Sequence, residues 1–404
     1  MIKKIKFCEV CNTRLKNFLN LGNHPMCDDL RKDCSKKKNR LFPISLSLCS
    51  ECLTVNQKIH ISKQKLFPKK YHYRAKLTKD VLLGQKNLVL KTEKYYGNLK
   101  GKVVLDIGAN DCSLLNEFKK KGANTFAIEP TNAIRDGNKS HKKFQTYFNY
   151  KVAKKIKKLC KQVDFITFTN VFAHINNLKD LINNLKVLIS EKTILIIENH
   201  YLGSVLKSNQ FDTFYSEHLR TYSLNSFMHI AKTLNMDVKL AEFPSRYGGN
   251  IRVFLGNKDN VKKNKKFNNL LNKEKVFKNK FKKMKMYINK WQSKKKKIIL
   301  KLNKIHGPLP AKAFPGRAAI ILKLLNLNND NISAIYEKPD SKKIGFYAPG
   351  TNIKILSEKE LKNFNKDIPV INLAWHISKE IRDYLIEKKI KNKIINIIEK
   401  KDFL

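Results

Sequence analysis

The stretch Val103-Val-Leu-Asp-Ile-Gly-Ala-Asn-Asp111 decides the fold of this chain. Its apolar first half predicts a buried strand, and its glycine predicts a tight turn into a helix at 114–121. Such a turn brings the backbone close to a ligand, and the first N–H groups of the helix point toward that ligand. We therefore expect Asp106, Gly108 and Asn110 to line a cofactor site.

Strands and helices alternate outward from this stretch. Helices are predicted at 178–189 and 224–234. Further apolar runs predict parallel strands at 125–128, 163–169 and 193–198. This alternation predicts a parallel, doubly wound sheet. Two more predicted strands, 237–243 and 250–255, lie close in sequence, which would let them pair antiparallel at one edge.

A carboxylate at the end of the next predicted strand indicates the kind of cofactor. Glu129 follows Phe-Ala-Ile, about twenty residues after the turn, where it can accept hydrogen bonds from ribose hydroxyls. The turn lacks the Gly-x-Gly-x-x-Gly pattern of pyrophosphate sites, which favours a nucleoside ligand over a dinucleotide. The combination indicates S-adenosylmethionine. The alternative is an ordinary α/β turn with a carboxylate at a strand end.

Four cysteines form two pairs with the spacing of metal knuckles, Cys8-x-x-Cys11 and Cys49-x-x-Cys52. Zinc takes four thiolates in a tetrahedron, and a complete set of protein ligands makes the ion structural rather than catalytic. Cys27 and Cys34 are rival ligands or ordinary small core residues. Disulfides are the alternative in a secreted protein. Because the N-terminus has no apolar signal segment, we expect a cytoplasmic protein.

The chain is strongly basic: 83 basic and 33 acidic residues among 404 leave a formal net charge of +50. Two interpretations compete, an anionic partner such as nucleic acid and a bias toward AT-rich codons. The lysines are spread along the chain without Gly-Arg or aromatic-basic repeats, so we favour codon bias and expect no nucleic-acid partner. No apolar run of about 18 residues occurs, so no membrane span is predicted.

The chain divides into four predicted parts. Residues 1–70 form the zinc-binding module, and residues 71–256 form the cofactor-binding domain. Residues 257–305 are very rich in lysine, yet aromatic and aliphatic residues recur there at helical spacing. That spacing predicts one or two amphipathic helices rather than a disordered basic linker. Residues 306–404 are predicted to form a second α/β unit.

Acid-base side chains gather in Phe214-Tyr-Ser-Glu-His-Leu-Arg-Thr-Tyr222, which follows the last predicted parallel strand. Substrates of open α/β sheets bind at the carboxyl ends of the strands. His218 titrates near neutrality and can act as a general base, which Glu217 can orient. The hydroxyl of Tyr215 or Tyr222 can donate to an oxyanion. The alternative is a structural histidine.

Several segments match one protein family and occur in the family's order. The chain resembles the zinc-containing sugar C-methyltransferases, which methylate nucleotide-linked keto-deoxysugars. Besides the cysteine pairs and the strand-turn motif, the matching segments are Leu21-Gly-Asn-His-Pro-Met-Cys-Asp-Asp29, Tyr71-His-Tyr73, Ile128-Glu-Pro130, Asn170-Val-Phe-Ala-His174, Phe211-Asp-Thr-Phe-Tyr-Ser-Glu-His-Leu219, Gly248-Gly-Asn-Ile-Arg-Val-Phe254 and Tyr347-Ala-Pro-Gly-Thr351.

The resemblance implies a Rossmann-like class I methyltransferase domain with an N-terminal zinc-binding module and a C-terminal α/β Rossmann-like domain. A nucleotide sugar would lie between the two Rossmann-like domains. By the same resemblance, His218 is the expected base, assisted by Tyr215 and Glu217. The residues expected to bind S-adenosylmethionine are Asp106, Gly108, Asn110, Glu129 and Asn170. The residues expected to bind the sugar are Tyr73, Tyr222 and Arg252.

Two positions depart from the family pattern. Cys112 stands where the family usually has glycine, so a side chain is expected to crowd the turn beside the cofactor. The segment Pro310-Ala-Lys-Ala-Phe-Pro-Gly-Arg317 is poorer in glycine than its family counterpart, so its nucleotide contacts are expected to differ. Two other functions fit the residues. One is a zinc-containing RNA methyltransferase, although no Asn-Pro-Pro-Tyr motif is present. The other is a non-catalytic sugar-nucleotide or protein-binding scaffold, an alternative that the departure at Cys112 supports.

Overall fold

A seven-stranded sheet forms the centre of the chain, with strand order β12-β13-β10-β9-β6-β7-β8. In this computed structural model the described residues are 2–33, 39–69, 71, 73–258, 265–363 and 365–404. The strands of the central sheet are β6 (Val103–Ile107), β7 (Asn124–Ile128), β8 (Lys142–Phe144), β9 (Phe165–Thr169), β10 (Ile194–His200), β12 (Met236–Glu242) and β13 (Asn250–Asn257). The quoted stretch therefore supplies β6, an interior strand that lies between β9 and β7.

The direction of the strands matches the prediction. The pairs of β6 with β7, β7 with β8, β6 with β9 and β9 with β10 are parallel. Strand β13 runs antiparallel to both β10 and β12, so the two closing strands pair at one edge as expected. The parallel strands end on one edge of the sheet, where their carboxyl ends bring following residues together.

Helices cover both faces of this sheet, as a sheet with a buried parallel core requires. One face packs against α2 (Lys79–Tyr96) and α3 (Ser113–Lys120). The other face packs against α4 (Tyr150–Leu159), α5 (Leu178–Lys186) and α7 (Leu224–Thr233). Hydrophobic residues on α4 and α5 recur at helical spacing, which explains why these segments bury one side and expose lysines on the other.

The N-terminal part forms a second, antiparallel sheet with strand order β11-β4-β3-β2. Its strands are β2 (Leu19–Pro25), β3 (Leu41–Leu48), β4 (Val55–Gln57) and β11 (Arg220–Thr221), and β1 (Ile2–Lys4) pairs with β5 (Ile59–Ile61) beside it, ahead of α1 (Lys63–Leu66). Strand β11 comes from the central part of the sequence and pairs with β4. The sheet of the N-terminal module therefore crosses the boundary that was predicted at residue 70.

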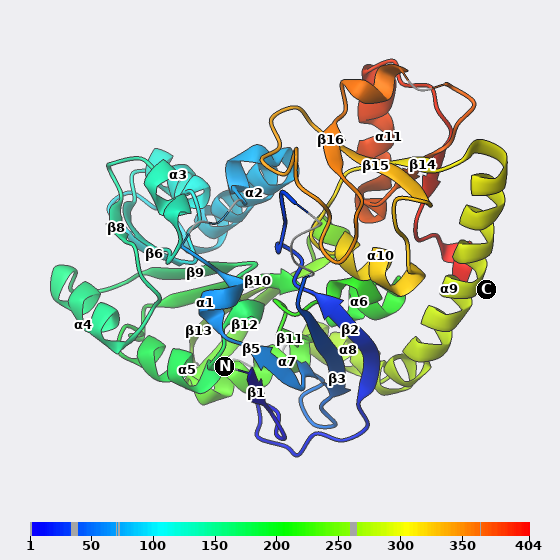
Figure 1. The fold of residues 1–404 in the computed structure, drawn as a ribbon. Coiled ribbons are helices and arrows are strands. Elements are labelled where there is room, and N and C mark those ends of the chain that lie inside the picture. The colour runs from blue at the N-terminus through cyan, green and yellow to red at the C-terminus, as the bar shows by residue number, and fades with distance from the viewer. Residues whose placement is uncertain (1, 34–38, 70, 72, 259–264, 364) are drawn as a thin grey trace.

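Two helices connect the central and C-terminal parts: α8 (Lys265–Glu274) and the 30-residue α9 (Phe277–His306). The apolar stripe of α9 is buried, including Phe281 and Trp291, so this lysine-rich segment is an amphipathic helix as predicted. Figure 1 shows α9, in yellow, curving along one side of the molecule past α10 (Ala318–Leu325). A short helix, α6 (Leu202–Lys207), packs against it from the central part.

The C-terminal part is a five-stranded parallel sheet with order β16-β15-β14-β17-β18. Its elements are β14 (Leu309–Lys312), β15 (Ile332–Glu337), β16 (Ile355–Ser357), β17 (Val370–Asn372), α11 (Ser378–Glu387) and β18 (Ile394–Asn396). The strand order reverses between β14 and β17, which is the position where α/β sheets bind ligands. Within the described part of the chain, no helix has both the length and the apolar character to cross a bilayer.

Candidate functional site

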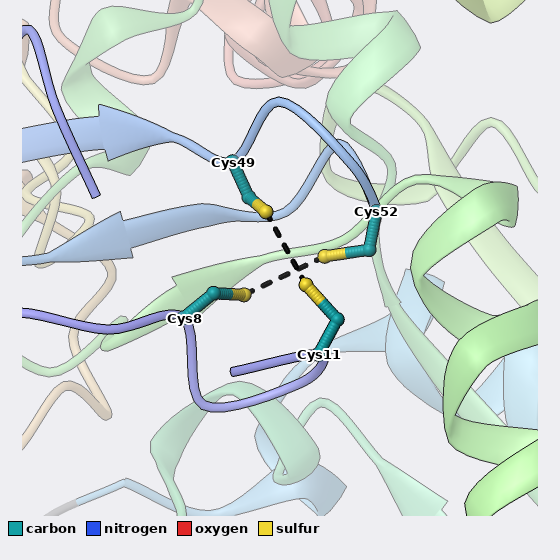
Figure 2. Close-up of side chains that lie close together, drawn as sticks. All are labelled: Cys8, Cys11, Cys49 and Cys52. Atoms are coloured by element: carbon teal, nitrogen blue, oxygen red, sulfur yellow. Dashed lines mark hydrogen bonds between the residues drawn. The ribbon is translucent and has the colours of Figure 1, made fainter. Parts of the chain in front are cut away.

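The four predicted metal ligands meet in the N-terminal module. Their sulfur atoms all lie within 4.8 Å of one another, and Figure 2 shows them converging from two turns of the chain. The Cys8 and Cys52 sulfurs are 3.5 Å apart, and the Cys11 and Cys49 sulfurs are 3.4 Å apart. A tetrahedral zinc ion with bonds of about 2.3 Å needs sulfurs about 3.8 Å apart, whereas a disulfide needs about 2.0 Å. The residues therefore fit a structural zinc ion.

Of the two rival cysteines, Cys27 is not part of this cluster. It is buried elsewhere, where its backbone N–H donates to Glu217 Oε1 at 3.0 Å. Cys34 and His72, a member of the matched Tyr71-His-Tyr73 segment, lie outside the described residues.

The zinc-binding module holds the segment that carries the predicted base. The buried Gln57 amide donates to the carbonyl oxygens of Tyr215 and His218, at 2.6 and 3.2 Å. Glu9, which lies between two zinc ligands, pairs with Arg220. Gln57 belongs to β4 and Glu9 to the first cysteine knuckle, so both are parts of the zinc module. The geometry of that module therefore determines where the turn 215–218 lies.

His218 lies above the carboxyl ends of β9 and β10. Its ring centroid is 4.8 Å from that of His174, which follows β9, and 5.2 Å from that of His200, which ends β10. The side chain is 6% exposed. Burial, reinforced by the two neighbouring histidines, lowers the pKa of His218 well below its usual value, so the ring is neutral at pH 7.

The hydrogen bonds of His218 determine which nitrogen carries the proton. Nδ1 lies 2.8 Å from the carbonyl oxygen of Thr213, which can only accept, so Nδ1 is the donor. Nε2 therefore has a free electron pair and accepts the hydroxyl of Tyr215 at 2.8 Å. The structure brings His218 and Tyr215 together in the arrangement that a base and its proton relay require.

Glu217 completes this group but has a different protonation state. Burial, with a contribution from Asp28, raises its pKa to about 8. Oε1 accepts from Cys27, and Oε2 is buried without a hydrogen-bond partner among the described residues. The carboxyl group is therefore neutral near pH 7 and can donate a hydrogen bond.

The predicted cofactor residues surround the turn after β6. Glu129 Oε2 accepts from the backbone N–H of Asn110 at 3.1 Å, and the Asn110 amide donates to the carbonyl of Tyr73 at 3.3 Å. Asp106 is buried and accepts from the Thr167 hydroxyl at 2.7 Å, and burial raises its pKa to about 7. Asn170 follows β9, where its side-chain oxygen accepts from Asn250 at 3.2 Å.

The glycine of this turn has a steric role in addition to the predicted one. Gly108 has a φ of +81°, and a Cβ there would lie 2.5 Å from the side chain of Val171. The turn therefore needs glycine because the Val171 side chain occupies the space that a Cβ would fill.

Cys112 does not crowd the turn as expected. It adopts the left-handed conformation with φ of +62°, and its side chain is fully buried in the core that α2 and α3 form. Gly137 makes room for it, because a Cβ at 137 would lie 2.6 Å from the Cys112 sulfur. The substitution for glycine is accommodated by a second glycine on the interior side.

Two of the predicted substrate residues are not brought to this group. Tyr222 is fully buried against Phe172, and its hydroxyl accepts from Arg220 at 2.9 Å. Arg252 is buried in ion pairs with Glu198 and Glu242, at 2.7 and 3.1 Å. Both side chains are buried against protein partners and do not line the group around His218. Tyr73 does lie at its edge, where its hydroxyl is 3.4 Å from that of Tyr247.

Several residues at the site were missed by the sequence reasoning. His174 and His200 flank His218, and Tyr247 lies 5.8 Å from His200 between ring centroids. From the C-terminal part, Arg317 binds both carboxylate oxygens of Asp212, through Nε at 2.7 Å and Nη2 at 2.6 Å. His174, His200 and Arg317 follow or end strands, and that position was the available signal.

Buried polar atoms that lack hydrogen-bond partners within the described part of the chain gather at this edge of the sheet. They are Thr169 Oγ1, Asn199 Nδ2, His200 Nδ1, Glu217 Oε2 and Asn250 Oδ1. A buried polar atom left unpaired is unfavourable, and a set of them at strand ends is typical of a ligand site. Together with the Glu129 carboxylate beside the turn, they fit a polar nucleoside-containing ligand.

Comparison with known families gives three matches in chain order. Residues 8–67 match a model described as a zinc-binding domain, residues 79–239 match a methyltransferase domain, and residues 245–396 match a C-methyltransferase C-terminal domain. The C-methyltransferase NovU of Streptomyces niveus is 23% identical over 258 residues. That alignment covers 63% of this chain and 61% of the length of NovU.

Two solved structures each align with less than half of the chain. Magnesium protoporphyrin IX methyltransferase from Synechocystis PCC 6803, solved with bound SAH, is 14% identical with a TM-score of 0.35, covering 44% of this chain and 83% of its own. The PH0226 protein from Pyrococcus horikoshii OT3 is 14% identical with a TM-score of 0.36, covering 48% and 98%.

Removal of the zinc ion should destabilise the whole N-terminal module. We expect Cys52→Ser to lose zinc and several kcal/mol of stability, because binding energy at a structural site is folding energy. Zinc content by atomic emission and thermal unfolding measure the effect. Cys160→Ser, a partly buried cysteine outside the cluster, is the matched control. A Cys52→Ser protein with full zinc content and unchanged melting would contradict the assignment.

The packing of Cys112 against Gly137 can be tested by a double-mutant cycle. Gly137→Ala should cost about 1–3 kcal/mol through overpacking against the sulfur. Adding Cys112→Gly should restore most of that loss, because the clash disappears. Urea denaturation gives the three free energies of unfolding. Additive losses would show that the two residues do not share this space.

Glu217 should make stability depend on pH in a specific direction. The folded protein keeps the proton up to about pH 8, whereas an ordinary glutamate loses it near 4.5. Between these values the folded state binds the extra proton, so its free energy of unfolding falls as pH rises. Glu217→Gln should remove this part of the decline in urea denaturation between about pH 5 and 8. The exposed Glu191→Gln is the control, and parallel curves for wild type and Glu217→Gln would refute the raised pKa.

Proposed function

We propose that this chain, which belongs to the zinc-containing C-methyltransferase family, transfers a methyl group from S-adenosylmethionine to a carbon atom of a nucleotide-linked keto-deoxysugar. The observation that carries the proposal is the neutral His218, whose Nε2 accepts from Tyr215 above the carboxyl ends of β9 and β10. A carbon next to a ketone becomes nucleophilic only after it loses a proton, so this chemistry needs such a base.

The residues around the turn after β6 would hold the methyl donor. Glu129 would accept from the ribose hydroxyls, and the backbone at Asn110 would border the donor. Asn170, at the end of β9, lies toward the histidine group. When bound, S-adenosylmethionine supplies a methyl group made electrophilic by its positively charged sulfur.

The proton of the acceptor carbon would pass to His218 through Tyr215. The Tyr215 hydroxyl gives its proton to Nε2 while its oxygen takes the proton from carbon, so the charge left on the sugar spreads onto the ketone oxygen. The Nδ1–H bond to Thr213 holds the ring during this transfer. Neutral Glu217 can donate a hydrogen bond to the oxygen that gains charge.

The nucleotide part of the substrate would lie between the central and C-terminal parts. Asp212 and Arg317 join the two beside the histidine group, and the ring nitrogen of the partly buried Trp375 also donates to Asp212 at 2.8 Å. The high positive charge of the chain would attract the phosphates. With Cys112 packed in the core, the feature that favoured a non-catalytic scaffold does not obstruct the cofactor turn.

His218→Ala should abolish turnover and leave donor binding intact. A positioned base typically contributes about 10²–10⁴-fold to the rate. The assay incubates the protein with S-adenosylmethionine and a panel of keto-sugar nucleotides, with mass spectrometry reporting a gain of one methyl group. Calorimetry measures the binding of S-adenosylhomocysteine in parallel.

The control is His229→Ala, which removes a half-buried histidine on α7, away from the site. Full activity in His218→Ala would exclude it as the base, and lost cofactor binding would make its role structural. Methylation of RNA and of no sugar nucleotide would overturn the proposed substrate.

A further inference from the structure

One buried arginine at the edge of the site has most of its hydrogen-bonding capacity unused. Arg246 lies between β12 and β13 and is 7% exposed. Nη1 donates to Glu198 Oε1 at 3.2 Å. Among the described residues, neither Nε nor Nη2 has a hydrogen-bond partner. The carboxylate of Asp80 lies 3.8 Å from Nε, which is too long for a hydrogen bond.

A neighbouring arginine shows what a purely structural guanidinium looks like in this fold. Arg252 is also buried and also pairs with Glu198, but all three of its nitrogens have partners. Burying charged donors without partners is unfavourable. The contrast between the two arginines therefore indicates that Arg246 serves a group outside the protein.

The two unpaired nitrogens of Arg246, Nε and Nη2, lie on the side of a guanidinium that can bind both oxygens of a carboxylate. Arg317 uses the same two nitrogens, Nε and Nη2, to bind both oxygens of Asp212 at 2.7 and 2.6 Å. Paired N–H groups on a planar fork match the two oxygens of a carboxylate in shape and charge.

The chain makes space for this guanidinium beside the cofactor turn. Arg246 lies directly against Gly84 of α2, where any Cβ would collide with it. Its guanidinium carbon is 5.4 Å from the ring of Tyr247. Tyr247 contacts Tyr73, whose carbonyl accepts from Asn110 of the turn.

A second path of contacts connects Arg246 to the other proposed cofactor residue. Glu198 Oε1, which Arg246 binds, also accepts from Asn250, and Asn250 in turn donates to Asn170. Arg246 is thus connected to Asn110 on one side and Asn170 on the other. If Glu129 takes the ribose, the amino-acid end of the donor extends away from β7, toward α2 and β10.

We propose that Arg246 binds the α-carboxylate of the methyl donor through Nε and Nη2. This assignment rests on the proposed function, because it takes S-adenosylmethionine as the ligand. An anionic group of the sugar nucleotide has similar chemistry, and the experiment separates the two sources.

Calorimetry with two ligands tests the assignment. S-adenosylhomocysteine carries the carboxylate, whereas 5′-methylthioadenosine has the same nucleoside and thioether but no amino acid. Arg246→Met should weaken binding of S-adenosylhomocysteine about 10- to 100-fold, the usual cost of a lost charged hydrogen bond. Binding of 5′-methylthioadenosine should stay within about twofold. Arg246→Lys should be intermediate, because it keeps the charge and loses the fork.

The controls distinguish the remaining explanations. Arg382→Met removes one exposed positive charge on α11 and should leave both affinities unchanged. Equal weakening of both ligands by Arg246→Met, or a large fall in melting temperature, would overturn the proposal in favour of a structural role. Unchanged S-adenosylhomocysteine binding with a raised KM for the sugar nucleotide would assign Arg246 to the acceptor instead. A wild-type protein that binds neither ligand would overturn the proposed cofactor itself and the assignment with it.

Discussion

A single hydrogen bond, from His218 Nδ1 to the carbonyl oxygen of Thr213, underlies the chemistry that we propose for this protein. Because a carbonyl oxygen cannot donate, the bond places the proton on Nδ1 and leaves the electron pair on Nε2. Burial beside two other histidines then keeps the ring neutral. An exposed histidine at the same place would have neither a defined tautomer nor a defined charge.

The segment 211–219 that carries this histidine is also where the three parts of the chain meet. The zinc module holds it through Gln57 and Cys27. The central sheet contributes His174, whose Nδ1 donates to the carbonyl of Glu217 at 2.6 Å. The C-terminal part binds it through Arg317. The structural metal site is thereby connected, through one strand pair and a few hydrogen bonds, to the position of the proposed base.

The buried charged groups at the site differ in whether they have partners. This difference distinguishes the groups that stabilise the fold from those proposed to bind a ligand. Glu198 is fully buried and neutralised by Arg252, whose three nitrogens all have hydrogen-bond partners. Glu217 is also buried but forms no ion pair among the described residues, and burial raises its pKa, so it holds its proton instead. Arg252 and Arg246 differ in the same way, because only Arg252 has a partner for every nitrogen. The unpaired buried polar atoms likewise mark the proposed ligand site.

The sequence by itself determined the features that depend on residues close to one another along the chain. The strand-turn-helix at 103–121, the two cysteine pairs and the amphipathic α9 follow from periodicity and short spacing, and so did the choice of His218 as the candidate base. Tertiary structure alone decided the direction and partners of side chains: Cys112 turns inward toward Gly137, Gly108 makes room for Val171, and Tyr222 and Arg252 face the core. The physical reason is that a local pattern specifies an element and its buried face. Contacts such as Arg317 with Asp212 form between elements about a hundred residues apart, and only the packed chain brings them together.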